Sequence, residues 1–233
     1  MPLSYGAGTL GVELTMDRFK YPRTYHLPYS PSVSDDDKML PDDSQFIGRE
    51  VSVSIKMDGE NTTVYPDGTC HARSLDGWGR KWQSWMTQYA RIWCNDIPDG
   101  WRVCGEDLYA RHSISYSFPD RSWFFQVFGI YNERNECLSI DEELEWCRLL
   151  GLRHVPVFYR GMYDRDAMLD AFGRWKDSEL DINGNETEGF VVRIANSFPY
   201  ADFSRNTGKY VRPHHVQTDS HWTSNWKPNI IKS

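Results

Sequence analysis

The chain has 233 residues, of which 39% are apolar and 15% are aromatic. This length and composition predict one substantial hydrophobic core and exclude a disordered or fibrous chain. Lysine and arginine number 26 against 33 aspartates and glutamates, so the formal net charge is -7. That balance excludes a protein that coats nucleic acid by bulk charge, but it allows a local basic groove.

The compartment is predicted from what the sequence lacks. No apolar run approaches the length of a membrane span, and the first ten residues lack the basic and apolar regions of a secretory signal. We therefore expect a cytoplasmic protein with no membrane partner. The five cysteines form no Cys-x-x-Cys pair, which favours free thiols over disulfides or a zinc site; they are Cys70, Cys94, Cys104, Cys137 and Cys147.

Residues 1–50 are predicted to be rich in loops, because they contain Pro22, Pro28, Pro31 and Pro41. The same segment is acidic. We interpret its aspartates as a solvated surface rather than a metal site, because adjacent aspartate side chains diverge; they are Asp35, Asp36, Asp37, Asp42 and Asp43.

Residues 51–56 alternate between apolar and polar side chains, which predicts a strand. Val51, Val53 and Ile55 would face the core, and Lys56 would end the opposite, polar face with Ser52 and Ser54. Asp58-Gly59 indicates a tight turn, so residues 62–65 are predicted to form the returning strand. Another turn at residues 66–68 leads to a third strand at 70–74.

Residues 79–93 have helical periodicity. The apolar positions form one stripe that we expect to pack in the core: Trp82, Trp85, Met86, Tyr89, Ile92 and Trp93. Arg80, Lys81 and Arg91 lie off this stripe and are available to solvent or a ligand.

The rest of the chain mixes strands and helices. Strands are predicted at 101–108, 123–131, 188–195 and 209–212. A helix at 141–150 would start at a Ser139/Glu142 capping box and end at Gly151, and Asp164 would cap a helix at 165–176. Strands in hairpins with interposed helices predict an α+β fold with largely antiparallel sheets flanked by helices.

Polar residues recur beside strand ends around this apolar sheet: Lys56, Arg73, Glu106, Glu188 and Lys209. Each alone could be an ordinary edge residue. Together they would place two cations and two carboxylates near Lys56 at the mouth of a sheet. A lysine amine in such a setting can act as a nucleophile.

The order of these motifs resembles the covalent nucleotidyltransferases. Lys56-Met57-Asp58-Gly59-Glu60-Asn61 resembles their KxDGxx motif. The other elements follow in family order: Ala72-Arg73-Ser74, Gly105-Glu106, and residues 125–130, 188–193 and 209–212. The resemblance spans residues 51–212 and is greatest to the nick-sealing branch of ATP-dependent RNA ligases, among small bacterial and phage members. It implies the adenylation-domain fold.

The resemblance implies a catalytic set of Lys56, Glu188 and Lys209. Lys56 would attack the α-phosphate of ATP to form lysyl-AMP. Glu188 would bind a divalent metal, Mg²⁺ or Mn²⁺, or orient Lys56, and Lys209 would neutralise the α-phosphate. Nucleotidyl transfer needs this kind of positioning and charge neutralisation more than acid–base chemistry.

The resemblance also implies a nucleotide-binding set. Asn61 would orient the phosphates, Arg73 would contact the phosphate and the RNA end, and Glu106 would accept hydrogen bonds from the ribose. Phe128 would stack on adenine, although core packing without a ligand is an alternative, and Ile55 and Lys209 complete the set. The implied ligands are ATP or AMP and RNA with 3′-hydroxyl and 5′-phosphate ends, together with an end-healing kinase or phosphatase as partner.

Basic residues near the motifs are predicted to hold RNA: Arg73, Arg80, Lys81, Arg205 and Arg212. The related ligases carry two lysines two positions apart in the final motif, whereas here Val211 follows Lys209. Arg193 or Arg205 could supply the missing cation.

Only 21 residues follow Arg212, which is too few for the OB-fold of DNA ligases and capping enzymes. We therefore expect a single nucleotidyltransferase domain over 1–233, with a loop-rich segment 1–50 and a tail at 213–233. His214, His215 and His221 in that tail match no standard zinc spacing. A DNA ligase, a capping-type guanylyltransferase and a non-catalytic RNA- or nucleotide-binding protein remain the alternatives.

Overall fold

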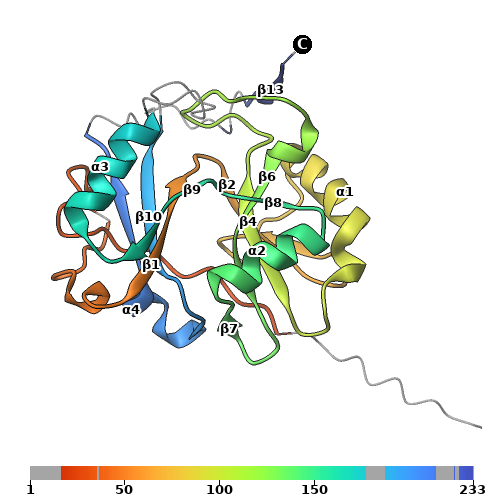
Figure 1. Cartoon of the computed structure of the whole chain (residues 1–233). Helices are drawn as coiled ribbons and strands as arrows, with labels where there is room; N and C mark the ends of the chain where they lie inside the picture. Colours follow the sequence, from red (N-terminus) through yellow and green to blue (C-terminus); the bar gives the residue numbers. More distant parts are fainter. Residues whose placement is uncertain (1–16, 36, 177–186, 214–222, 224–225, 233) are drawn as a thin grey trace, which may run out of the picture.

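The computed structural model describes residues 17–35, 37–176, 187–213, 223 and 226–232. Two sheets, antiparallel except for one strand pair, dominate the fold (Figure 1). Helix α3 (Arg165–Lys176) lies beside one sheet, and helices α1 (Ser84–Trp93) and α2 (Ile140–Leu149) lie beside the other. The α+β prediction is confirmed. None of the described helices is long and apolar enough to cross a membrane.

The four-stranded sheet has the order β12-β10-β1-β9. Its strands are β1 (Glu50–Lys56), β9 (Val157–Met162), β10 (Gly189–Ile194) and β12 (Thr207–Val211). The predicted core face of β1 is confirmed, because Val51, Val53 and Ile55 are buried in the core, and Ser52 on the opposite face is also buried, where it lines the cavity described below. The outer face of β10 packs on α3, where the rings of Phe172 and Phe190 lie 5.1 Å apart.

The seven-stranded sheet has the order β11-β7-β6-β4-β2-β3, with β8 paired to β6. Its strands are β2 (Glu60–Val64), β3 (Cys70–Ala72), β4 (Arg102–Asp107), β6 (Phe125–Tyr131), β7 (Glu136–Cys137), β8 (Arg153–His154) and β11 (Phe198–Pro199). A second core lies between this sheet and helices α1 and α2. A separate parallel pair joins β5 (Ser117–Phe118) to β13 (Ile230–Ile231).

The helix ends follow the sequence signals. The Ser139/Glu142 capping box begins α2, and Gly151 follows its end with φ of 67°. The Asp164 carboxylate accepts the Ala167 N–H at 3.0 Å at the start of α3. A short helix α4 (Phe203–Asn206) precedes β12.

Two predictions around α1 need correction. The helix begins at Ser84, after a 3₁₀ turn at Lys81–Gln83, rather than at residue 79. Ile92 is 77% exposed instead of buried. At about 100° per residue, Ile92 lies roughly 120° around the helix from the buried Met86, which places it outside the packed face.

The hairpin predicted after Lys56 is also wrong. Strand β2 pairs with β3 and β4 of the other sheet instead of returning alongside β1. The chain crosses between the sheets at Gly59, where a Cβ atom would lie 2.5 Å from the Asp107 carbonyl oxygen, so only glycine fits. This crossing puts Lys56 and β2 on opposite sides of a space between the sheets.

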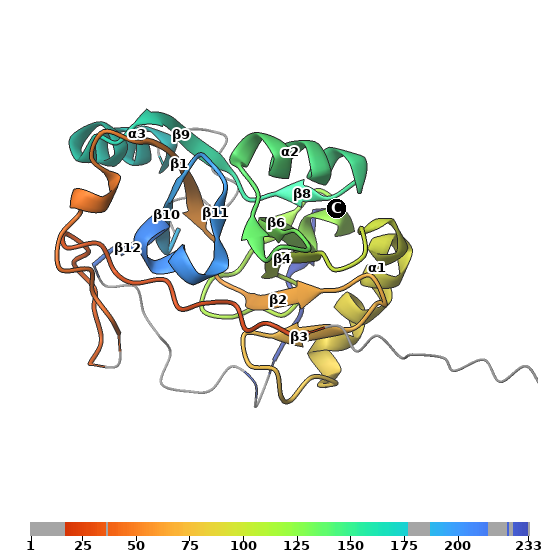
Figure 2. The same cartoon turned by 90° about the horizontal axis from the view of Figure 1, so that it is seen from below.

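The loop-rich N-terminal segment spans both sheets, and residues 17–35 and 37–40 are called the N-terminal strap below (Figure 2). Arg18 pairs at 2.6 Å with Asp67, which lies in the turn between β2 and β3 of the seven-stranded sheet. Farther along, the Leu27 N–H donates to the Lys209 carbonyl of β12 at 2.8 Å. The strap therefore tethers one sheet to the other. The tail residues His214, His215 and His221 lie outside the described residues.

Candidate active site

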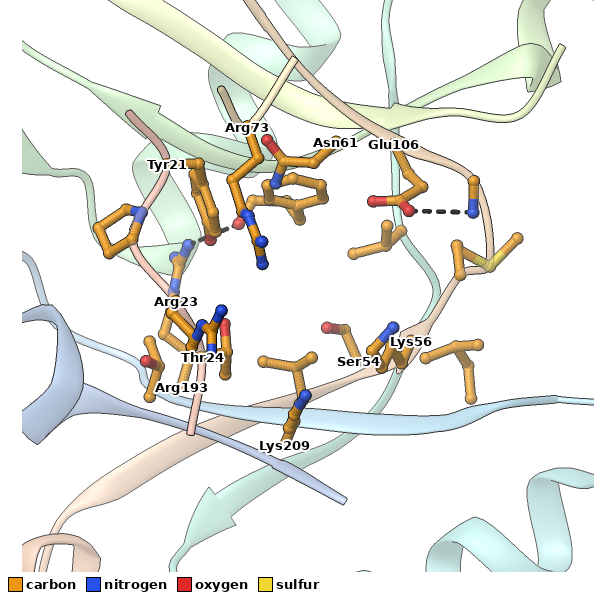
Figure 3. Close-up of a pocket in the computed structure, with 18 of the residues that line it drawn as sticks. Tyr21, Arg23, Thr24, Ser54, Lys56, Asn61, Arg73, Glu106, Arg193 and Lys209 are labelled. Carbon is orange, nitrogen blue, oxygen red and sulfur yellow. Dashed lines mark hydrogen bonds between the residues drawn. The ribbon is translucent and has the colours of Figure 1, made fainter. Parts of the chain in front are cut away.

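A cavity of about 550 Å³ lies between the two sheets (Figure 3). This volume falls within the range of small-molecule sites. Its walls come from the inner face of the four-stranded sheet, from strands of the seven-stranded sheet and from the N-terminal strap. The sequence-predicted residues that line it are Ile55, Lys56, Asn61, Arg73, Glu106, Phe128 and Lys209.

Lys56 ends β1 at this cavity, and its side chain is 26% exposed. Its Nζ lies 2.5 Å from Oε2 of Glu188, the residue just before β10. Burial disfavours the charged amine, but Glu188 and Glu106 outweigh it and raise the pKa of Lys56 above its ordinary value. The unliganded site therefore holds an ammonium ion, which must lose its proton before the nitrogen can act as a nucleophile.

Glu106 on β4 faces Lys56 from the other sheet. Its Oε1 accepts the Gly59 N–H at 3.0 Å, which joins the crossing after Lys56 to this carboxyl group. Burial raises the pKa of Glu106 to about 8, although Lys56 and the Gly59 N–H favour the ionised form. A carboxyl group fixed in this way can accept hydrogen bonds from a polar ligand such as a sugar hydroxyl.

Replacing Glu106 with glutamine is expected to change how stability depends on pH. The wild-type carboxyl binds its proton more tightly when folded, so folding stability should fall as pH rises from about 4.5 to about 8. The Glu106→Gln variant should lack that part of the decline. Urea unfolding at pH 5, 6.5 and 8 measures it, with the exposed Glu145→Gln as control. Parallel pH profiles for wild type and Glu106→Gln would contradict the assignment.

The aspartate of the Lys56 motif has a structural role that the sequence did not reveal. Oδ2 of Asp58 accepts hydrogen bonds from the Ile114 N–H at 2.7 Å and the Ser113 hydroxyl at 2.8 Å. Its own N–H donates to the Tyr116 hydroxyl at 2.8 Å. Asp58 therefore ties the segment after β4 to the turn that carries Lys56.

Polar groups cluster on the walls near Lys56. Asn61 on β2 lines the cavity, and its Oδ1 is buried and accepts no hydrogen bond from the described part of the chain. Arg73 follows β3 and is exposed at the cavity rim. Lys209 on β12 reaches the cavity from the sheet that holds Lys56 (Figure 3). An anionic ligand would meet positive charge from both sheets here.

The apolar part of the cavity is built around Phe128. Its ring is only partly buried and meets Tyr21 of the strap edge-to-face, with centroids 4.9 Å apart. Val191 and Ile55 line the cavity from the opposite sheet. Phe128 therefore packs on the strap and still presents surface to the cavity, so core packing does not use the whole ring.

The strap residues at the cavity were missed by the sequence analysis. They are Tyr21, Pro22, Arg23, Thr24, Ser34 and Asp37. Proline-rich loops carry no periodicity, so only the fold could place them. Asp37 corrects the view that the acidic residues here are all surface residues, because its Oδ1 lies 2.9 Å from Lys209 Nζ.

The two candidates for a second cation beside Lys209 do not fill that role. Arg193 lines the cavity, but its guanidinium donates to the buried Glu143 carboxylate at 2.6 Å and to the Phe128 carbonyl at 3.3 Å. Arg205 is 80% exposed and lies 3.8 Å from Asp202. Arg193 is thus held by other partners in the cavity wall, and Arg205 is not among the residues that line the cavity.

The other residues of the predicted RNA-binding set do not line the cavity. Arg80 and Lys81 are exposed beside the start of α1. Arg212 donates to the Thr187 carbonyl at 2.7 Å and thereby supports the strand start next to Glu188. Only Arg73 of the predicted RNA-binding set lines the cavity itself.

A metal ion would find few protein ligands. No group of three or more histidine, cysteine, aspartate or glutamate side chains among the described residues is arranged to hold one. Magnesium characteristically binds through one or two carboxylates together with substrate phosphates. Glu188, beside Lys56, fits that limited role, and phosphates would supply the other ligands.

Comparisons with known proteins identify the family and the fold. A model of the RNA ligase family matches residues 49–211. An archaeal ATP-dependent RNA ligase, form 1, has 16% identity and a TM-score of 0.51, covering 84% of this chain and 48% of that chain. An RNA ligase of Naegleria gruberi, solved with ATP and Mn, has 14% identity and a TM-score of 0.53, covering 84% of this chain and 56% of that one.

At such identities the likeness to these structures shows the fold, which is the nucleotidyltransferase fold of ATP-dependent ligases. The chain spans about half the length of these two ligases. No curated protein matches the sequence.

Proposed function

The chain belongs to the RNA ligase family, and we propose that it joins RNA 3′-hydroxyl and 5′-phosphate ends at the expense of ATP. The observation that carries the proposal is that Lys56, which pairs with Glu188, lines a cavity together with Glu106, Phe128 and Lys209. A nucleophile, an aromatic face, a carboxyl group and cations around one space suit a nucleoside triphosphate.

In the first step, the Lys56 amine attacks the α-phosphorus of ATP. A nitrogen–phosphorus bond forms, the bond to the β-phosphate oxygen breaks, and pyrophosphate leaves. The amine first loses its proton to solvent, and Glu188, 2.5 Å from Nζ, orients it for the attack. Lys209 and Arg73 neutralise the developing charge, and Asn61 orients the phosphates.

Glu188 would hold a divalent ion, Mg²⁺ or Mn²⁺, and that ion would supply further charge neutralisation. The nucleoside would lie across the cavity. Phe128 would stack on adenine, Ile55 and Val191 would cover its other side, and Glu106 would accept hydrogen bonds from the ribose.

Two further steps complete the reaction. The RNA 5′-phosphate oxygen attacks the phosphorus of lysyl-AMP and frees the Lys56 amine. The RNA 3′-hydroxyl then attacks the activated 5′-phosphate and releases AMP. Because only a 3′-hydroxyl and a 5′-phosphate fit this chemistry, other ends would first need a kinase or phosphatase.

RNA would be held through its backbone by Arg73 at the cavity rim and by four cations outside the cavity, Arg80, Lys81, Arg205 and Arg212. Since the net charge is -7, this binding depends on a local patch and should weaken strongly with salt.

The test is a joining assay with ATP, Mg²⁺ and RNA strands that carry a 5′-phosphate. We expect 5′-adenylylated RNA and a joined product. Either open strands or nicked strands, or both, should serve as substrates. Parallel reactions with GTP and with all-DNA strands separate this function from a capping enzyme and a DNA ligase. Joining of DNA alone, or protein labelling by GTP alone, would overturn the proposal.

Replacing Phe128 with alanine is expected to raise the KM for ATP about 5- to 150-fold, since stacking of a base on an aromatic ring contributes about 1–3 kcal/mol. Initial rates of protein adenylylation at varied ATP measure the effect. Phe128→Tyr keeps the ring and should stay near wild type. An unchanged KM in Phe128→Ala would place adenine elsewhere.

A further inference from the structure

Asp37 contacts the one residue of β12 that is expected to meet the α-phosphate. Its Oδ1 lies 2.9 Å from Lys209 Nζ. The Lys209 side chain is only 16% exposed, so this ion pair lies in the cavity wall and not on the open surface.

The Asp37 carboxylate is itself held in place. Its Oδ2 accepts the Ser34 hydroxyl at 2.7 Å and lies 3.3 Å from Nε2 of the buried His26. Burial disfavours the carboxylate, but the hydrogen bonds from Ser34 and Lys209 outweigh it and hold the pKa of Asp37 well below its usual range. Asp37 is therefore an anion at neutral pH.

The strap also fixes the backbone of Lys209. The Lys209 N–H donates to the Tyr25 carbonyl at 2.8 Å, and its carbonyl accepts the Leu27 N–H at 2.8 Å. Two residues farther along β12, the Val211 N–H donates to Ser30 Oγ at 3.0 Å. Backbone and ammonium group are thus both held by the same segment.

We propose that Asp37 is a positioning residue that aims the Lys209 ammonium group at the α-phosphate of ATP, an inference that rests on the proposed function. A lysine has a flexible four-carbon stem, and a charge that is already oriented costs no reorganisation when the transition state forms. The strap supplies this restraint in a chain where Val211 stands in place of a second lysine. If Asp37 instead competed with phosphate for Lys209, Asp37→Asn would form lysyl-AMP faster than wild type.

The kinetic test uses Asp37→Asn, Lys209→Ala and the double variant. Asp37→Asn should lower the rate constant of lysyl-AMP formation about 10- to 100-fold, as expected for a misplaced catalytic group, with the KM for ATP changed less than about threefold. In the Lys209→Ala background the same change should add nothing. Asp37→Glu, which keeps the charge, should recover part of the rate. Asp35→Asn, from the same segment, should match wild type.

A second readout does not need activity. In protein labelled with ¹⁵N-lysine, the Lys209 ammonium signal should be protected in wild type and Asp35→Asn and lost in Asp37→Asn. If wild type forms no lysyl-AMP, the proposed function fails, and this signal alone decides the role of Asp37. The inference is overturned if Asp37→Asn keeps the signal, reacts as fast as wild type or faster, or adds to Lys209→Ala.

Discussion

Replacing Lys56 with alanine is expected to abolish covalent labelling of the protein by α-labelled ATP, a loss of about 10³-fold or more, as for other catalytic nucleophiles. Lys209 is the other lysine among the described residues that line the cavity, and it is paired with Asp37, while the arginines stay protonated. Lys56→Arg should be equally inactive for that reason, although it keeps the positive charge beside Glu188.

The labelling rate of wild type should rise with pH between about pH 6 and pH 8. The pKa of Lys56 lies above its ordinary value because Glu188 and Glu106 outweigh the effect of burial. Below that pKa, each rise in pH increases the fraction of neutral amine, which is the form that attacks. A rate that falls over this range would mean that the amine is not the group that limits the reaction.

Denaturing gels after incubation with labelled ATP and Mg²⁺ give the measurement. Lys227→Ala removes an exposed lysine away from the cavity and should label like wild type. Label that persists in Lys56→Ala would contradict the assignment of the nucleophile. Unfolding curves of both variants show whether any loss reflects the fold.

The sequence was most informative where local pattern and chemistry coincide. Strict alternation in residues 51–56 placed Val53 in the core and Lys56 on the opposite face, and both placements are confirmed. The polar residues that recur in this pattern lie around one site. Lys56, Arg73, Glu106 and Lys209 line the cavity, and Glu188 pairs with Lys56. Motif order therefore carried three-dimensional information.

The pairing between strands was harder to predict from the sequence. Asp58-Gly59 has the composition of a hairpin turn, yet β2 belongs to the other sheet. The deciding fact is the close approach of Gly59 to the Asp107 carbonyl, which joins residues nearly fifty positions apart. No local signal reports such a contact.

The contacts of the N-terminal strap with the site could not be predicted from the sequence for a related reason. Tyr21 contacts Phe128 and Asp37 contacts Lys209, and both partners lie more than a hundred residues farther along the chain. A proline-rich acidic segment has the composition of a surface loop, and for Asp35 that interpretation holds. Only tertiary contacts distinguish Asp37, which pairs with Lys209, from the exposed Asp35.

Replacing Glu143 with alanine is expected to destabilise the fold by about 3–5 kcal/mol, because it leaves the buried Arg193 guanidinium without its counter-charge. Glu143 is fully buried on α2, with Arg193 at 2.6 Å and His154 Nε2 at 2.8 Å. For a chain of this size the melting temperature should fall by about 6–20 °C. Urea unfolding measures the loss in free energy.

A matched variant lies on the same helix. Glu145 is exposed and pairs with Arg148 at the surface, so Glu145→Ala should change stability by less than about 1 kcal/mol. Equal losses of stability in the two variants would show that the substitutions destabilise helix α2 itself and not the buried ion pair. Glu143→Gln, which keeps the hydrogen-bonding shape, should lie between them.

The pH dependence follows from the same cluster. Burial disfavours the Glu143 carboxylate, but Arg193 and His154 outweigh it and lower the pKa of Glu143 to about 2. Its contribution to stability is therefore complete above the ordinary glutamate value of 4.5 and is lost as pH falls towards 2. The stability gap between wild type and Glu143→Gln should narrow over that interval. Since Arg193 also holds the Phe128 carbonyl at 3.3 Å, Glu143→Gln should raise the KM for ATP as well, linking the buried ion pair to the nucleotide site.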